Sequence, residues 1–264
     1  MQNRYFGDVG DFGKYGLLRI LSGLGTHPIL KLGVVWYLFP DEAHNADGKH
    51  IGYLQNCDPA FRDCDEELYD KLRASLFDDL GIIEHHRHTD LAESAGLLPQ
   101  GAVFYSTPLS YSKELSSSAR LSLRKEWFAG ALAKTACADL VFLDPDNGIE
   151  CVSVKRTGNK GPKYAFWEDM DAFIGRGQSI VVYHHLNRTG SHLEQVERKL
   201  RQMNERYGNG FESAVVIFKR GTNRAYFVLA APQHTEILRE RLHRLAVSPW
   251  SRHFVAYESK VEER

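Results

Sequence analysis

Short apolar runs alternate with longer amphipathic stretches along most of this chain of 264 residues. The apolar runs span residues 32 to 38, 102 to 106, 139 to 143 and 179 to 183. The helical patterns between them lie at about 64 to 80, 113 to 134 and 189 to 206. Strands that alternate with helices pair in parallel, and helices then cover both faces of the sheet. The pattern therefore predicts an α/β fold with a Rossmann-like, mostly parallel sheet.

The C-terminal part of the chain follows a different pattern. Two apolar runs, 213 to 218 and 225 to 230, flank the turn K-R-G-T-N-R, and a helical pattern follows them. Such spacing is typical of an antiparallel hairpin. A parallel sheet with an antiparallel strand near the C-terminus is the layout of the class I methyltransferase fold.

Length and charge narrow the classes of protein that remain. We predict one domain over residues 1–264, with polar, turn-rich loop insertions near 40–62 and 147–163. The net charge of -1 excludes a protein that coats nucleic acid through a global basic field, although a local basic patch is compatible with it.

No apolar run reaches the roughly 20 residues of a membrane span, so we expect a cytoplasmic protein with no membrane partner. The four cysteines form no C-x-x-C pair, and we predict no structural metal site.

The motif D-P-D-N-G, residues 144 to 148, follows the apolar run 139 to 143 directly. Open α/β sheets bind their ligands at the carboxyl ends of parallel strands. We therefore predict that Asp144, Asp146 and Asn147 belong to a catalytic site. The same five residues are also favourable turn chemistry, so a purely structural role stays open.

The next apolar run ends in Tyr183, His184 and His185. Because side chains of a strand alternate between its faces, one ring should point toward the cleft and its neighbour away from it. Tyr183 and His184 are further candidates for the catalytic site.

The N-terminal stretch G-D-V-G-D-F-G-K-Y-G-L-L-R-I-L, residues 7 to 21, carries the most specific motif. It resembles the opening segment of the large-subunit ribosomal RNA adenine-N6 methyltransferases, in which similarly spaced Gly, Asp, Asp and Lys residues precede an apolar helix. The stretch A-D-L-V-F-L-D-P-D-N-G resembles the catalytic strand and Asp-Pro loop of the same family. The resemblance implies an S-adenosylmethionine-dependent methyltransferase that acts on nucleic acid.

The resemblance also implies roles for single residues. It places the N-terminal segment beside the cofactor, and we assign Asp8, Asp11, Lys14 and Asp41 to cofactor binding. It implies that Asp144 orients an exocyclic amino group of a base.

Two positions depart from the pattern of the family. Leu38 to Glu42 follow the first apolar run, where a glycine-rich turn is expected. Asp146 and Asn147 stand where a proline and an aromatic ring would line and stack on a base.

A basic stretch, K-R-T-G-N-K-G-P-K, runs from 155 to 163 directly after the Asp-Pro loop. Cations beside a catalytic pocket can hold a phosphate backbone. We therefore predict that Lys155, Arg156, Lys160 and Lys163 contact nucleic acid, either DNA or RNA. The alternative is a solvated loop without a ligand.

Two other functions remain compatible with these residues. Asp144 and Asp146 could bind Mg²⁺ together with Asp8, Asp11 or Asp41, while Lys14 neutralises a phosphate. This set would make the protein a metal-dependent nuclease or phosphodiesterase. The third alternative is a non-catalytic binding protein that has kept the fold and lost the cofactor.

Overall fold

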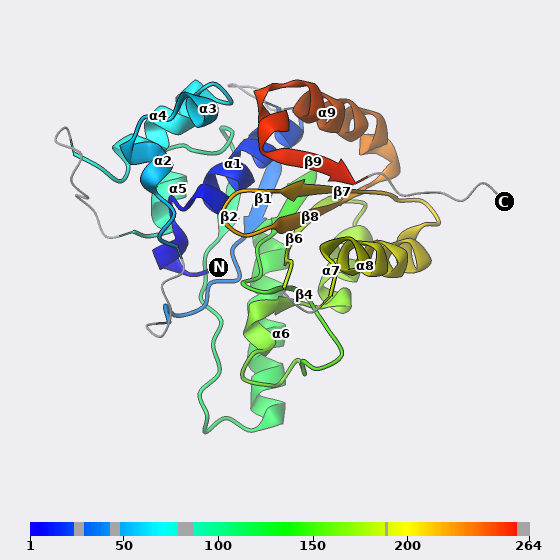
Figure 1. The fold of residues 1–264 in the computed structure, drawn as a ribbon. Coiled ribbons are helices and arrows are strands. Elements are labelled where there is room, and N and C mark those ends of the chain that lie inside the picture. Colours follow the sequence, from blue (N-terminus) through cyan, green and yellow to red (C-terminus); the bar gives the residue numbers. More distant parts are fainter. Residues whose placement is uncertain (24–28, 43–47, 79–86, 188–189, 258–264) are drawn as a thin grey trace.

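The computed structural model of the protein describes residues 1–23, 29–42, 48–78, 87–187 and 190–257. In this part of the chain, seven strands form one sheet in the order β2-β1-β3-β6-β8-β7-β9 (Figure 1). The strands are β1 (Leu32–Val35), β2 (Val103–Tyr105), β3 (Leu140–Leu143), β6 (Ser179–His185), β7 (Glu212–Phe218), β8 (Arg224–Ala230) and β9 (Phe254–Tyr257). Strands β2, β1, β3 and β6 pair in parallel, β8 is antiparallel to both β6 and β7, and β9 is antiparallel to β7. The predicted α/β fold and mostly parallel sheet are confirmed.

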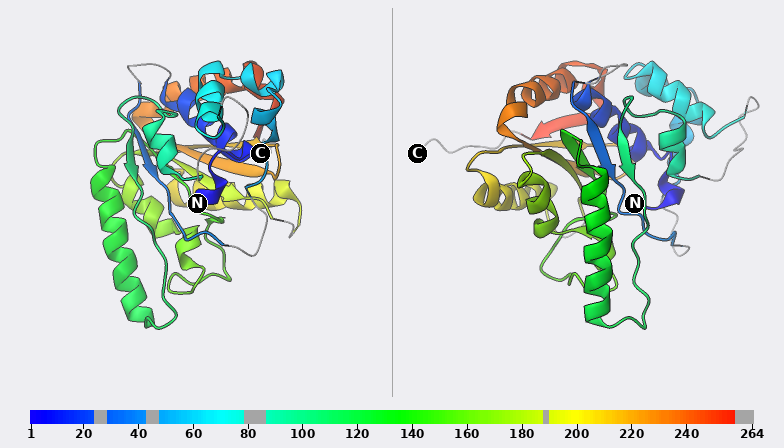
Figure 2. Two further views of the ribbon diagram at one scale, coloured as in Figure 1. Left: turned by 90° about the vertical axis from the view of Figure 1, so that its left-hand side faces the viewer. Right: turned by 180° about the vertical axis from the view of Figure 1, so that it is seen from behind.

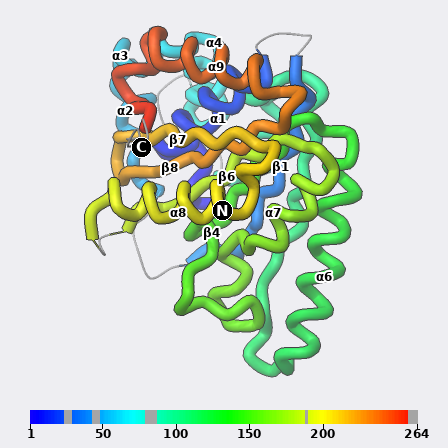
Figure 3. The backbone as a smooth tube through the Cα atoms, turned by 90° about the vertical axis from the view of Figure 1, so that its right-hand side faces the viewer, coloured from blue at the N-terminus to red at the C-terminus, as the bar shows by residue number. Residues whose placement is uncertain are grey.

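Helices cover both faces of this sheet (Figures 1, 2 and 3). One face carries α1 (Val9–Ser22), α4 (Glu66–Ala74) and α9 (Thr235–Val247). The other face carries α6 (Ser117–Lys134), α7 (Trp167–Ile174) and α8 (His192–Tyr207). Each layer of helices buries its own hydrophobic core against the sheet.

The central strands belong to both cores. Leu140 and Phe142 of β3 pack into the core under α1, whereas Val141 and Leu143 pack into the core under α6 and α7. Because both faces are buried, the strand has no polar position, which explains its continuous apolar sequence.

Helix α1 approaches the sheet closely. Its N-cap is Asp8, whose carboxylate accepts a hydrogen bond from the backbone N–H of Gly10. Gly10, Gly13 and Gly16 follow along one side of the helix. A Cβ atom at any of the three would come within 2.1 to 2.5 Å of a side chain from β7, β8 or the 3-10 helix η4 (Pro249–Arg252). These glycines therefore allow close helix packing, which brings the N-terminal segment to the end of the sheet.

The two segments expected to be loop insertions contain short regular elements. The first includes α2 (Gly52–Gln55) and α3 (Pro59–Arg62), which pack with α4. In the second, β4 (Gly148–Ile149) pairs in parallel with β5 (Tyr164–Ala165), preceded by the 3-10 helix η2 (Gly161–Lys163).

The remaining elements are η1 (Asn3–Tyr5), α5 (Asp90–Ser94) and η3 (Pro232–His234). Within the described residues, no helix combines the length and the apolar character that a membrane span requires.

Candidate active site

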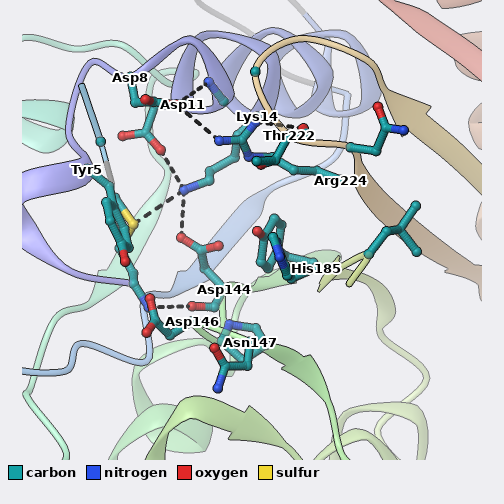
Figure 4. Close-up of a pocket in the computed structure, with 18 of the residues that line it drawn as sticks. Tyr5, Asp8, Asp11, Lys14, Asp144, Asp146, Asn147, His185, Thr222 and Arg224 are labelled. Carbon is teal, nitrogen blue, oxygen red and sulfur yellow. Dashed lines mark hydrogen bonds and ion pairs between the residues drawn. The ribbon is translucent and has the colours of Figure 1, made fainter. Parts of the chain in front are cut away.

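A pocket of about 800 Å³ lies at the carboxyl ends of β3 and β6. The first turns of α1 and the turn between β7 and β8 form its other walls (Figure 4). Of the residues predicted from the sequence, eight line this pocket: Asp8, Asp11, Lys14, Asp144, Asp146, Asn147, Lys163 and Tyr183. The pocket therefore brings together the two segments that carry the family resemblance. Its size is within the range of small-molecule sites.

Lys14 lies between two carboxylates in the wall of the pocket (Figure 4). Its Nζ atom is 2.8 Å from Oδ1 of Asp11 and 2.7 Å from Oδ2 of Asp144. All three side chains are buried. Burial alone would lower the pKa of Lys14, but the two carboxylates outweigh it and raise the pKa. The lysine is therefore a fixed cation rather than a base.

Asp11 completes this cluster from within α1. Burial raises the pKa of Asp11, and the Lys14 ammonium opposes that shift. Oδ2 of Asp11 accepts a hydrogen bond from the hydroxyl of Tyr15 at 3.2 Å. Tyr15 therefore orients Asp11 from inside the core.

Asp8 links α1 to the turn between β7 and β8. Its Oδ1 atom is 3.1 Å from Nη2 of Arg224, and its Oδ2 atom accepts a hydrogen bond from the backbone N–H of His50. Arg224 lies where a Cβ atom on Gly10 would be, so only glycine leaves room for this contact. The sequence gives no signal for Arg224, because it follows a hairpin turn more than 200 residues from Asp8.

Asp146 belongs to a second group of charges at the floor of the pocket. Its Oδ2 atom accepts hydrogen bonds from Nε2 of Gln2 and from Nζ of Lys163, both at 3.0 Å. Lys163 also pairs with Glu42 at 2.6 Å. Burial would raise the pKa of Asp146, but the amino group of residue 1 and Lys163 lower it below its ordinary value. Sequence reasoning missed Gln2 and Glu42, which no motif marks.

Strand alternation separates the side chains at the end of β6. Tyr183 and His185 line the pocket, whereas His184 does not. Nδ1 of His184 accepts a hydrogen bond from the backbone N–H of Ile149 at 3.1 Å. Burial, reinforced by the nearby cation of Lys199, lowers the pKa of His184 to about 3. The structure does not place His184 in the pocket, and its neutral ring holds β4 instead.

Asp41 also lies outside the pocket. It is exposed, and its carboxylate accepts a hydrogen bond from the backbone N–H of Arg4 at 3.3 Å. The turn that leads away from β1 carries it past the pocket margin.

The four cations of the basic stretch divide into two kinds. Nη2 of Arg156 is 2.8 Å from Oδ1 of the buried Asp169, and Lys163 pairs with carboxylates of the pocket. Lys155 and Lys160 are exposed. Tertiary ion pairs therefore engage two of the four predicted cations, and contact of the four with nucleic acid stays a prediction.

The carboxylates of the pocket do not fit a divalent cation. Among the described residues, no group of three or more His, Cys, Asp or Glu side chains is arranged to hold a metal ion. Nζ of Lys14 lies at the point between Asp11 and Asp144 where a shared ion would bind. Asp146 is engaged by Lys163, and Asp8 by Arg224. The ligand set suggested for Mg²⁺ is thus separated into three ion-paired groups.

The end of β1 differs from a cofactor turn. Trp36 and Tyr37 are fully buried there, and Tyr37 has a φ of +47°, a conformation that glycine adopts more readily. Its hydroxyl donates a hydrogen bond to Asp169 on the far side of the sheet. Trp36 belongs to the core under α1 and Tyr37 to the core under α6, and residues 36 to 42 contain no glycine.

The adjacent pocket offers groups that suit the same cofactor. S-adenosylmethionine carries a sulfonium, an ammonium, a carboxylate and two ribose hydroxyls. Asp8, Asp144 and Asp146 could bind the cations and hydroxyls, Arg224 the carboxylate, and the ring of Tyr5 an apolar face. These residues would hold the cofactor at the ends of β3 and β6.

Neither protein-family models nor curated proteins match this chain.

Proposed function

We propose that the protein is an S-adenosylmethionine-dependent methyltransferase-like enzyme of the class I type, which modifies an amino group of a nucleic-acid base. The observation that carries this proposal is the ion pair between Lys14 and Asp144, 2.7 Å long. It joins the N-terminal motif to the Asp-Pro loop, 130 residues away, in the wall of one pocket. These are the two segments that resemble the adenine-N6 methyltransferases.

The order of the strands supports the class I assignment. Antiparallel β8 lies between β6 and β7, which run in the same direction. In the resembled fold an antiparallel strand near the C-terminus holds this place. Fold alone does not specify an activity, so the site residues carry the functional argument.

Asp144 is the residue that would orient the acceptor. A carboxylate accepts hydrogen bonds from an amine, which directs the nitrogen lone pair toward an electrophile. Lys14 fixes Oδ2 of Asp144 and compensates its charge, so Lys14 is a positioning residue. The cofactor, when bound, supplies an electrophilic methyl group. Lys49 and His50 are exposed at the pocket margin, where they could contact a phosphate backbone.

Transfer of a labelled methyl group from S-adenosylmethionine to single-stranded DNA, duplex DNA and RNA tests this proposal. We expect transfer to one of the three, and at least a 100-fold loss for Asp144→Asn. Stability should change by only about 1 kcal/mol, because the amide oxygen can still accept from Lys14.

Asp139→Asn is the matched control. Asp139 precedes the same strand at its opposite end, where its carboxylate accepts a hydrogen bond from the backbone of Lys31. This variant should keep its activity. Full activity of Asp144→Asn, or no binding of S-adenosylmethionine in calorimetry, would refute the proposal.

A further inference from the structure

The carboxylate of Asp146 has one satisfied and one unsatisfied oxygen. Gln2 and Lys163 both donate to Oδ2. Oδ1 is buried and has no hydrogen-bond partner, and the side chain as a whole is only 4% exposed. The amino group of residue 1 forms a long ion pair with Oδ1, at 3.8 Å, which is beyond hydrogen-bond distance. Buried polar atoms without partners are rare, and each one requires an explanation.

The position of Asp146 suggests what the missing partner is. The residue lines the pocket two positions after Asp144, where a proline would line a base in the resembled family, beside an aromatic ring at the next position. A carboxylate cannot stack on a base, and when ionised it only accepts hydrogen bonds. The ionised form is favoured here, since its cationic neighbours lower the pKa of Asp146.

We propose that Oδ1 of Asp146 accepts a hydrogen bond from an N–H or O–H donor of a nucleoside ligand in the pocket. The inference rests on the proposed function, because it assigns a role within the same site. In this arrangement the protein recognises the ligand through a hydrogen bond to Asp146, and not through stacking on the base. Ligands that present a donor at this point should bind, and ligands that present an acceptor there should be rejected.

Two parts of a nucleoside can supply such a donor. One is an amino or imino group on the base edge, as in guanine, which presents adjacent N–H donors. The other is a ribose hydroxyl, whether of a nucleotide substrate or of the cofactor. The chemistry is the same in both cases, and the experiment must separate them.

The surroundings of Asp146 make one substitution informative. In Asp146→Asn, the amide oxygen should face Gln2 and Lys163, because both are donors. The NH₂ group then takes the place of Oδ1, in a residue that lines the pocket. The variant keeps the shape of the side chain and inverts its polarity at the point where the ligand binds.

Calorimetric titration of the full chain with GMP, IMP, dGMP and S-adenosylhomocysteine tests the inference. We expect the wild type to bind at least one of these probes, and Asp146→Asn to bind it at least tenfold more weakly. Asp63→Asn, an exposed carboxylate paired with Arg252, is the matched control and should bind like the wild type.

The four probes distinguish the source of the donor. Weaker binding of IMP than of GMP by the wild type identifies the base amino group, and weaker binding of dGMP identifies the ribose hydroxyl. A loss confined to S-adenosylhomocysteine assigns the donor to the cofactor.

Two results would overturn the inference: equal affinities of the wild type and Asp146→Asn for every probe that binds, or no binding of any probe by the wild type. The methyl-transfer assay separates this failure from that of the proposed function. Methyl transfer by an Asp146→Asn variant with unchanged affinities would leave the function standing and remove the role of Asp146. If Asp146→Asn weakened nucleotide binding but the wild type transferred no methyl group, the role of Asp146 would stand and the proposed function would be refuted.

Discussion

Two buried ion networks lie at opposite faces of the sheet, and one of them lines the pocket at the ends of β3 and β6. In the first, Lys14 joins Asp11 and Asp144 in the pocket wall. In the second, Arg124 and Arg156 bind Asp169, away from the residues that line the pocket. Both networks connect segments that are distant in the sequence, so burial of charge does not by itself indicate a functional site.

The partners of the carboxylates distinguish the two networks. Oδ1 of Asp169 binds Arg156, and Oδ2 accepts hydrogen bonds from Arg124, from the hydroxyl of Tyr37 and from the backbone N–H of Phe166. Both guanidinium groups also lie over the ring of Phe166, at 4.7 and 5.1 Å from its centroid. Every donor in this set is internal, which is what a network that holds a loop in place requires. The pocket instead contains Asp146, one oxygen of which has no hydrogen-bond partner.

The largest effect on stability should come from the network around Asp169. Asp169→Ala leaves Arg124 buried without its counter-ion, and we expect a loss of about 3 to 5 kcal/mol in the free energy of unfolding. Urea unfolding measures this loss. The affinity of the folded variant for S-adenosylmethionine should be unchanged at 10 °C. A stable variant with weakened binding would reverse the roles that we assign to the two networks.

Lys14→Met should lower both stability and ligand affinity. At pH 7 we expect a loss of about 3 kcal/mol, since Asp11 and Asp144 then lie buried without a cation. Burial already raises the pKa of Asp11. A raised pKa in the folded state favours folding at low pH and loses this contribution as pH rises through that pKa, so part of the loss should be recovered at pH 5.

Urea unfolding of Lys14→Met at pH 5 and pH 7, beside the wild type, measures this recovery. Binding of S-adenosylmethionine should weaken at least tenfold, unlike in Asp169→Ala. A variant with wild-type stability and affinity would show that the pocket network is dispensable.

His184 tests the boundary between the two faces, because its neighbours in β6 line the pocket and it does not. Its pKa is about 3 in the folded protein, and the ordinary value is 6.5. Below pH 6.5 His184 binds a proton in the unfolded chain but stays neutral in the folded protein. Its contribution to stability is therefore fully present above that pH and is lost as the pH is lowered. At pH 5 this group should cost about 2 kcal/mol relative to pH 7.5.

His184→Gln should remove that part of the pH dependence of urea unfolding, with methyl transfer retained at pH 7.5. An unchanged pH profile would mean that other groups, such as His253, whose pKa burial also lowers, account for it.

The smallest effect on stability should come from the exposed cations of the basic stretch. Lys155→Ala with Lys160→Ala should change the free energy of unfolding by less than about 0.5 kcal/mol. The slope of log K against log salt for nucleic-acid binding should fall by about 0.7 to 0.9 for each phosphate contact that is lost. Lys31→Ala with Lys134→Ala, exposed cations at the opposite end of the sheet, is the control. Equal slopes for the two double variants would leave the stretch without a role in binding.

Much of the fold could be predicted because its signals are local. The runs at 139 to 143 and 179 to 183 became β3 and β6, and the hairpin pattern became β7 and β8. In contrast, β9 was not predicted, since two of its four residues are exposed and its stability comes from pairing with β7. The short helices α2 and α3 were missed for a similar reason. Helices of four residues depend on tertiary packing rather than on their own sequence.

The positions of the site residues were harder to predict than the strands. Asp8, Asp11, Lys14 and Asp144 were grouped by resemblance, and the structure brings them to one pocket. His184 satisfied the same sequence criteria as Tyr183, but the direction of a side chain at the end of a strand depends on the register of the sheet.

The sequence by itself determined the alternation of strands and helices, the hairpin, and the glycines that allow α1 to lie close to the sheet. These features follow from the periodicity and size of neighbouring side chains. Only the tertiary structure decided which charges are paired. Arg224 reaches Asp8 from a distant hairpin, Arg156 is engaged by Asp169, and one oxygen of Asp146 has no hydrogen-bond partner. The physical reason is that an ion pair depends on distance in space, which the order of residues along the chain does not specify.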